Sequence, residues 1–354
     1  MTTLAAPHTP STAEHVSAAR FRRVRRRTTV HVGTGLLAFV LFVLTLAVGS
    51  VFVSPLDVFK SVFGISDDPL SQFIVRDLRL PTALTGLAVG MAFGMAGPMF
   101  QRMLRNPLAS PDFVGISSGA SLFAAAGIIV WHLSGVWVSS AALIGAAVSS
   151  LLIYLLAWKD GITGFRFILV GIGVSEFLLA INGYILARAQ IWDAKAAMQW
   201  LIGSVGNAGS VELNILLVIV ALSIPLVLML DRPLRALELG DDQATALGSR
   251  VEVARFLIIA LAVVLVAFAT AAAGPIPFVA LMAGPITARL LGPAGGGLIA
   301  AGFVGASIVL AADLVANHVM PEPMPTGVVT GLIGAPYLVW LLVTVNKGSG
   351  RGAS

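Results

Sequence analysis

The sequence predicts an all-α, polytopic membrane protein with about ten transmembrane helices. Of its 354 residues, 57% are hydrophobic and only 11% are charged, and the mean hydropathy is +0.94. A soluble domain carries about 25% charged residues, so this chain lacks the polar surface that a water-soluble globule needs. The apolar residues also fall into uncharged runs long enough to cross a bilayer as helices. The absence of cysteine excludes disulfides, zinc–thiolate sites and iron–sulfur ligation.

A polar, basic segment precedes the first apolar run. The chain begins with residues rich in Ala, Thr, Ser and Pro, and five arginines follow between Arg22 and Arg27. The uncharged run over residues 30–53 is too long for the apolar core of a signal peptide, and no Ala-x-Ala cleavage site follows it. We therefore expect an uncleaved first span. The expected regions are a disordered, basic cytoplasmic tail at 1–29, the transmembrane domain at 30–346 and a short cytoplasmic tail at 347–354.

Stretches without charged residues place the other nine spans. The stretch at 113–158 is long enough for two spans, which we expect to separate near residues 131–135. A second long stretch is divided by Gly274-Pro275-Ile276-Pro277, and the span that follows, at about 277–291, is the shortest of the set. The remaining single spans are expected at 80–101, 167–187, 213–230, 290–312 and 323–346.

The basic residues predict the orientation of the chain in the membrane. If the N-terminus is inside, 17 of the 22 Lys and Arg residues lie on the inner side, and the inverse topology would reverse that ratio. The positive-inside rule therefore favours an N-in, C-in arrangement. Orientation also explains the net charge of +5 better than binding of nucleic acid does.

Sequence motifs for catalysis and for nucleotide binding are absent. There is no G-x-x-x-x-G-K-[ST] phosphate loop, no H-E-x-x-H pair and no nucleophile elbow. We expect no catalytic residues, no metal site and no cofactor bound by this chain.

Two carboxylates fall within expected spans. Glu176 lies in the middle of one span, which also contains Asn182, and Asp313 lies near the end of another. A charge in the membrane is unfavourable and points to a proton relay or a substrate pathway. A role in helix packing or at the interface explains the two carboxylates equally well, and both interpretations stay open.

The inner segment at 231–255 carries nine charged residues in 25. Within residues 234–248 we expect two short helices separated by Gly240, with Asp241 in the first turn of the second helix and Gly248 just past its end. Ala244 and Leu247 are three residues apart and would share a small apolar face. Such a face can dock into a groove of a cytoplasmic partner, and the alternative is an ordinary solvated loop.

The second span carries small residues at helical spacing. Gly86, Gly90, Gly94 and Gly97 form a stripe that allows close packing of a neighbouring helix. An inner turn follows, rigid because of its prolines and Asn, and leads into the third span. This signature turn consists of Asn106, Pro107, Leu108 and Pro111 and continues to Gly115 and Gly119.

Five blocks together resemble one transporter family. They are the Arg79-Leu80-Pro81 block with the signature turn, Trp200–Ser204, Gly240–Gly248, Gly274-Pro275-Ile276, and a C-terminal block with Ala312-Asp313-Leu314 and Pro325-Thr326-Gly327. In this order, over about residues 35–345, the chain resembles the FecCD/BtuC-like permease subunits of type II ABC importers for iron–siderophores and cobalamin.

The resemblance implies a function and partners. It implies a multi-pass permease of the cytoplasmic (inner) membrane that moves a ferric siderophore inward, with ATP and Mg held by separate ATPase subunits. Those subunits would contact Gly240, Asp241, Ala244, Leu247 and Gly248, and the pathway would form beside a second permease chain. A substrate-binding lipoprotein would dock at Arg76 and Arg79. Cobalamin or haem is the alternative substrate, and a proton-coupled carrier using Glu176 and Asp313 is the alternative class.

The chain departs from the family pattern at two outer positions. Thr82 stands where the family often has a second Arg after Arg-Leu-Pro, and Asn317 stands where another Arg usually follows. Because such arginines resemble those that meet Glu residues of the binding protein, we expect a weaker or asymmetric docking surface. A heterodimer with a second permease that supplies the missing charges is therefore favoured over a homodimer.

Overall fold

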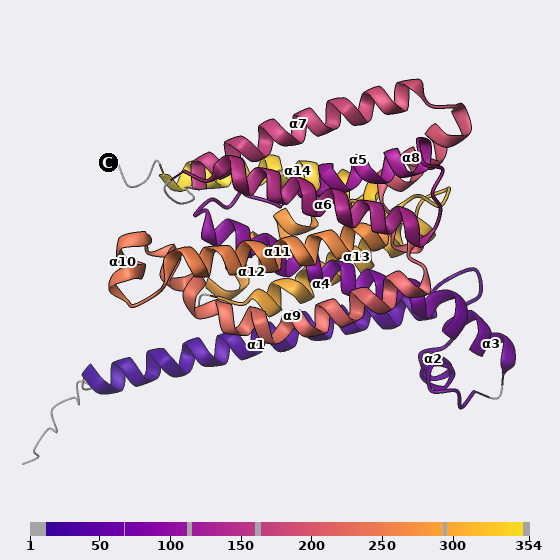
Figure 1. Ribbon diagram of the computed structural model, residues 1–354. Coiled ribbons are helices and arrows are strands. Elements are labelled where there is room, and N and C mark those ends of the chain that lie inside the picture. Colours follow the sequence, from indigo (N-terminus) through magenta and orange to yellow (C-terminus); the bar gives the residue numbers. More distant parts are fainter. Residues whose placement is uncertain (1–11, 67, 112–114, 160–163, 293–295, 350–354) are drawn as a thin grey trace, which may run out of the picture.

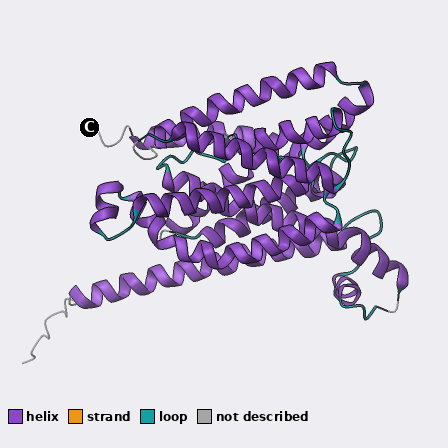
Figure 2. Ribbon diagram, viewed as in Figure 1, coloured by secondary structure: helices purple, strands orange, loops and turns teal. Residues whose placement is uncertain are grey.

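The computed structural model describes residues 12–66, 68–111, 115–159, 164–292 and 296–349, and within these ranges every regular element is a helix (Figure 2). The long helices run side by side in one bundle (Figure 1). Following the predicted orientation, we call the end that carries α10 the inner end and the end that carries α2, α3 and α8 the outer end.

Eight of the described helical stretches are long and apolar enough to cross a membrane. Their helices are α1 (Thr12–Ala47), α4 (Leu80–Met103), α6 (Val136–Ala157), α7 (Gly164–Arg188), α9 (Ser210–Glu238), α11 (Val251–Ala273), α13 (Leu298–His318) and α14 (Thr326–Ser349). Two shorter apolar helices, α5 (Ile116–Ile129) and α12 (Val279–Leu291), occupy the remaining two expected spans. The prediction of an all-helical bundle with about ten spans is confirmed, and α12 is the shortest of the ten, as expected.

The shorter elements lie mainly at the two ends of the bundle. They are α2 (Pro55–Val62), α3 (Pro69–Phe73), the π-helix η1 (Ile74–Arg79), α8 (Ile191–Ile202), the 3₁₀ turn η2 (Val205–Asn207) and α10 (Asp241–Ala246). Ser54 and Asp68 cap α2 and α3, because their side-chain oxygens accept hydrogen bonds from backbone N–H groups of the first turn.

Helix α4 is the central helix, and its glycines set how closely its neighbours approach. A Cβ on Gly90 would overlap the backbone of Ala306 in α13, one on Gly94 would overlap the Ala301 carbonyl, and one on Gly97 would overlap the Ala280 carbonyl of α12. The predicted glycine stripe is therefore a packing face for α13 and α12.

The structure differs from the expectation for the N-terminal tail. Helix α1 begins at Thr12, so residues 12–29 are helical rather than disordered, while residues 1–11 lie outside the described part. Between Thr12 and Val32 there is no Gly or Pro, and arginine is a good helix former. The helix of the first span therefore continues inward through the arginine run. At the other terminus, α14 extends to Ser349.

The inner segment also differs from the expectation. Leu234 is not the start of a separate short helix, because α9 runs without a break to Glu238. The chain first leaves the helix at Gly240, whose φ of 108° is favourable only for glycine. The segment at 234–248 thus contains one short helix, α10, and the inner end of a long one.

Candidate functional site

Helix α10 projects from the inner end of the bundle (Figure 1). Gly240 and Gly248 bound it, with φ of 108° and 81°, as their positions in the sequence predict. The N–H of Ser249 donates to the Ala244 carbonyl at 3.0 Å and closes the helix. The structure thus presents a compact turn of helix between two glycines at the inner surface.

The two apolar residues of this segment do not share a face, and that prediction is wrong. Ala244 is fully buried and belongs to the apolar cluster that includes Leu234 and Leu237 of α9. Leu247 caps the end of α10 and is 67% exposed. The exposed residues of this segment are Asp241, Asp242, Gln243, Thr245, Ala246, Leu247 and Gly248, and we call them the coupling surface after the role that the sequence predicts.

An ion pair ties α10 to the start of α11. Nη2 of Arg255 donates to both carboxylate oxygens of Asp241, at 2.8 and 3.0 Å, and Nη1 donates to Glu252 at 3.2 Å. The Arg255 side chain is 9% exposed and the Asp241 side chain is 53% exposed. A two-pronged contact to a buried guanidinium fixes the direction of the first turn of α10 relative to α11.

The signature turn lies beside α10. A Cβ built on Gly240 would lie 3.5 Å from Nη1 of Arg105, and both Arg105 and Pro107 are exposed. The Asn106 side chain accepts a hydrogen bond from the N–H of Leu108 at 2.9 Å, which shapes the turn. The sequence places this turn and α10 about 130 residues apart, and the fold brings them onto one inner surface.

The remaining residues of the signature turn shape the chain and the helix packing. Pro111 is buried, and Gly115 begins α5 with a φ of 87°, in the left-handed region. A Cβ on Gly119 would overlap the Gly145 carbonyl and Ser149 of α6, so this glycine allows α5 and α6 to pack closely.

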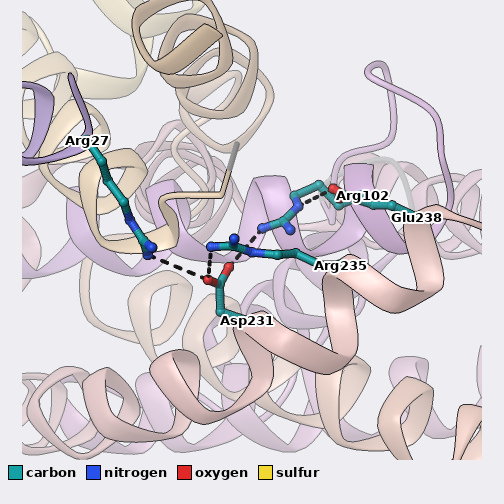
Figure 3. Close-up of polar contacts among 5 residues, drawn as sticks. All are labelled: Arg27, Arg102, Asp231, Arg235 and Glu238. Atoms are coloured by element: carbon teal, nitrogen blue, oxygen red, sulfur yellow. Dashed lines mark hydrogen bonds and ion pairs between the residues drawn. The ribbon is translucent and has the colours of Figure 1, made fainter. Parts of the chain in front are cut away.

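A cluster of charged side chains near the inner end joins the three helices α1, α4 and α9 (Figure 3). Asp231 of α9 accepts hydrogen bonds from Arg102 of α4 at 3.2 Å and Arg235 at 2.5 Å, and Arg27 of α1 approaches it at 3.6 Å. Arg102 also pairs with Glu238 through its Nε. This Asp231 cluster was not predicted, although the spacing of Asp231, Arg235 and Glu238 along one helix is a signal for the part contributed by α9.

At the outer end, Arg79 does not point outward as its predicted docking role requires. Its guanidinium donates to the carbonyls of Leu46, Ala47 and Val51 at 2.9, 3.1 and 2.6 Å. These are carbonyls at and just beyond the C-terminus of α1, which lack partners within the helix. Of the two predicted docking arginines, Arg76 alone is exposed.

Three of the blocks behind the resemblance meet at the outer end, which we call the outer hub. The N–H of Gly327 donates to the Gly203 carbonyl at 3.0 Å, and the N–H of Ser204 donates to Ala273 at 2.7 Å. A Cβ on Gly203 would overlap the Pro275 carbonyl, and one on Gly327 would overlap the Ile202 carbonyl. Segments from α8, α11 and α14 therefore contact one another through backbone atoms.

Asp313 belongs to this hub. It is 4% exposed, and it accepts hydrogen bonds from Thr326 at 3.0 Å and from Asn317 at 2.9 Å. Thr326 in turn accepts from the N–H of Val205 at 3.4 Å. These neutral donors favour the packing interpretation of Asp313 over a proton relay. They also give Asn317, at the position where the family usually has Arg, a defined contact.

Helix α7 lies at the edge of the bundle (Figure 1). Glu176 is exposed, and no other described atom lies near the positions that a Cβ would take on Gly173 or Gly183 of the same helix. Asn182 is buried, and its Oδ1 has no hydrogen-bond partner within the described part of the chain. The two predicted pathway residues therefore lie on different faces of α7.

Comparison with known proteins agrees with the fold. A sequence model of the FecCD transport family matches residues 36–344. The chain is 40% identical to the ferric enterobactin transport system permease protein FepG of Escherichia coli strain K12, covering 84% of this chain and 91% of that protein. It is 32% identical to the cobalamin import system permease protein BtuC of Halobacterium salinarum, covering 79% and 75%.

A solved structure described as an inward-facing, metal-chelate type ABC transporter shares this fold. Its TM-score is 0.80 at 26% identity, and the match covers 90% of this chain and 99% of that one.

Proposed function

Because the chain belongs to the FecCD transport family, we propose that it is the permease subunit of an ABC importer that carries a ferric siderophore across the cytoplasmic membrane. Relatives named for siderophore transport support this substrate class. They include the probable siderophore permease YfhA of Bacillus subtilis, 36% identical over 87% of this chain. The structural observation that carries the proposal is the coupling surface at the inner end.

The energy for transport comes from ATPase subunits that dock on the coupling surface. The large apolar side chain exposed on this surface is Leu247, and the exposed polar residues include Asp242 and Gln243. Ala244 holds Leu247 in position indirectly, because it is buried in the apolar cluster that packs α10 against α9. Arg105 and Pro107 of the signature turn extend the same surface. ATP and Mg stay on the ATPase subunits, and closure of these subunits moves α10.

A second permease chain completes the pathway beside α7. An exposed carboxylate such as Glu176 is unfavourable against lipid, so it faces either another protein chain or a water-filled passage. The open glycines of the same helix allow a neighbouring helix to approach closely. We favour a heterodimer, because Thr82 and Asn317 replace two arginines on the outer side and Arg79 is held inward. The binding lipoprotein then meets Arg76 of this chain and charges of the second permease.

Cobalamin is the second candidate substrate. The relative from Halobacterium salinarum, at 32% identity, carries that name. The test is uptake by the complete transporter in liposomes, with ferric enterobactin and cobalamin as separate probes and ATP inside or absent. We expect ATP-dependent uptake of the ferric chelate. Uptake of cobalamin alone would reassign the substrate, and uptake driven by a pH gradient without ATP would overturn the importer class.

A variant pair tests the coupling surface within that assay. Leu247→Glu places a charge on the exposed contact without touching the buried core, and Leu247→Met is the conservative control. We expect Leu247→Glu to abolish substrate-stimulated ATPase activity and Leu247→Met to preserve it. Ala244→Glu is unsuitable, because Ala244 is buried and the variant would disturb the fold itself.

A further inference from the structure

The outer hairpin, which consists of the described residues 51–66 and 68–79, exposes a row of large apolar side chains beyond the end of α1. Leu56 and Phe59 of α2 and its C-cap residue, Phe63, are 60–65% exposed. Their spacing of three and four residues places them on one face of the helix. Leu70 and Phe73 of α3 add exposed apolar surface. A patch of this kind on a protein surface marks a contact with another molecule or with a membrane.

The opposite face of the outer hairpin is packed against the bundle. Val58 of α2 and Val75 of η1 are buried in a cluster with Leu46 and Ala47 of α1 and Ala83 of α4. The hydrogen bonds of Arg79 to the last carbonyls of α1 hold the same junction. The hairpin is thus fixed at the outer ends of two membrane-spanning helices, which is the level of the membrane–water interface.

The apolar face of the hairpin continues a surface that lipid already covers. Helix α1 lies at the edge of the bundle, and its exposed residues over 32–44 are apolar, including Leu37, Phe39 and Leu44. Figure 1 shows α2 and α3 extending sideways from the end of α1, away from the other helices. A surface that begins on the lipid-facing side of α1 therefore extends onto the hairpin.

We propose that the outer hairpin is an interfacial anchor, with Leu56, Phe59 and Phe63 inserted among the acyl chains of the outer leaflet. Amphipathic helices of this composition lie in the plane of the interface with their apolar side in the lipid. Lipid is always present, whereas a binding protein would leave this apolar face in water whenever it dissociated. The exposed charges Arg76 and Asp77 stand apart from this row, on η1, and remain available to a partner in water.

The absence of native cysteine makes a direct depth measurement possible. Single variants Leu56→Cys, Phe63→Cys and Asp77→Cys would each carry a nitroxide label in the complete transporter in phospholipid liposomes. Collision of the label with oxygen reports lipid, and collision with a water-soluble nickel chelate reports water. We expect the ratio of oxygen to nickel accessibility to be several-fold higher at positions 56 and 63 than at position 77. Addition of the binding protein should leave positions 56 and 63 unchanged.

Two results would overturn the anchor. One is nickel accessibility at positions 56 and 63 equal to that at position 77. The other is protection of positions 56 and 63 that begins only when the binding protein is added, which would assign the patch to protein docking. The unmodified chain gives an independent measurement, because a photoactivatable phospholipid should form adducts with peptides covering residues 55–65. A lack of such adducts, with normal labelling of α1, would also contradict the proposal.

Discussion

The two ends of the bundle are held together by different interactions. At the inner end, charged side chains make the connections, in the Asp231 cluster and in the Arg255–Asp241 pair. At the outer hub, backbone atoms meet directly across glycines, and the buried carboxylate Asp313 is satisfied by neutral donors. The inner connections lie next to the coupling surface, on which we propose that ATPase subunits dock.

The difference has a mechanical consequence. An arginine side chain has several rotatable bonds, so an ion pair can keep its contact while two helices shift by a fraction of an ångström. A glycine packed against a carbonyl allows no such adjustment, because protein interiors are close-packed. We infer that the inner end can rearrange under an applied force and that the outer hub moves as one body.

The largest expected effect is at the outer hub. Gly203→Ala introduces a Cβ at a φ of 74° and against the Pro275 carbonyl. We expect a loss of about 3 kcal/mol of stability or more, from backbone strain combined with overpacking. Gly206→Ala is the matched control three residues away, because its Cβ would meet only Oγ of Ser204, at 3.8 Å. Thermal unfolding in detergent distinguishes them, and equal midpoints would show that the hub is adjustable.

A smaller loss is expected at the inner end. Asp231→Ala leaves three guanidinium groups without their shared carboxylate. Because Arg27 and Arg235 are each 40% exposed, water compensates part of the loss, and we expect about 2 kcal/mol. Arg27→Ala removes the most distant partner and should cost less than about 1 kcal/mol. The same unfolding assay, at low and at high salt, compares the stability losses of the two variants. A larger loss for Arg27→Ala than for Asp231→Ala would contradict this prediction.

The third effect concerns coupling more than stability. Asp241→Asn and Arg255→Gln each weaken the tie between α10 and α11. Because Asp241 is half exposed, we expect about 1 kcal/mol of coupling between the two sites, or about a fivefold loss of ATP-driven uptake in either variant. The double variant should transport no less than either single one. If the loss of uptake in the double variant equalled the product of the two single losses, the two residues would not act through their contact.

Some of these features can be predicted from the sequence alone, and others cannot. Gly240 and Gly248 bound α10 as predicted, and the glycines of α4 form the predicted packing face. Both predictions depend only on properties of glycine itself, which are its backbone freedom and its lack of a side chain. The Asp231 cluster and the inward turn of Arg79 depend on contacts between segments far apart in the sequence, such as Arg27 with Asp231. A single sequence does not pair such positions. The burial of Ala244 was missed because the direction of a one-turn helix is set by its neighbours.

The smallest expected effect is at a side-chain contact of the outer hub. Thr326→Val removes the hydroxyl that donates to Asp313 and accepts from the N–H of Val205, while it keeps the shape of the side chain. Asp313 retains Asn317 as a donor, so we expect a loss of about 1 kcal/mol, the usual contribution of a hydrogen bond. Thr326→Ser keeps the hydroxyl and should unfold within a degree or two of the natural chain. If Thr326→Val destabilised the protein as much as Gly203→Ala, the hydroxyl rather than backbone packing would hold the outer hub together, and the contrast between the two ends would fail.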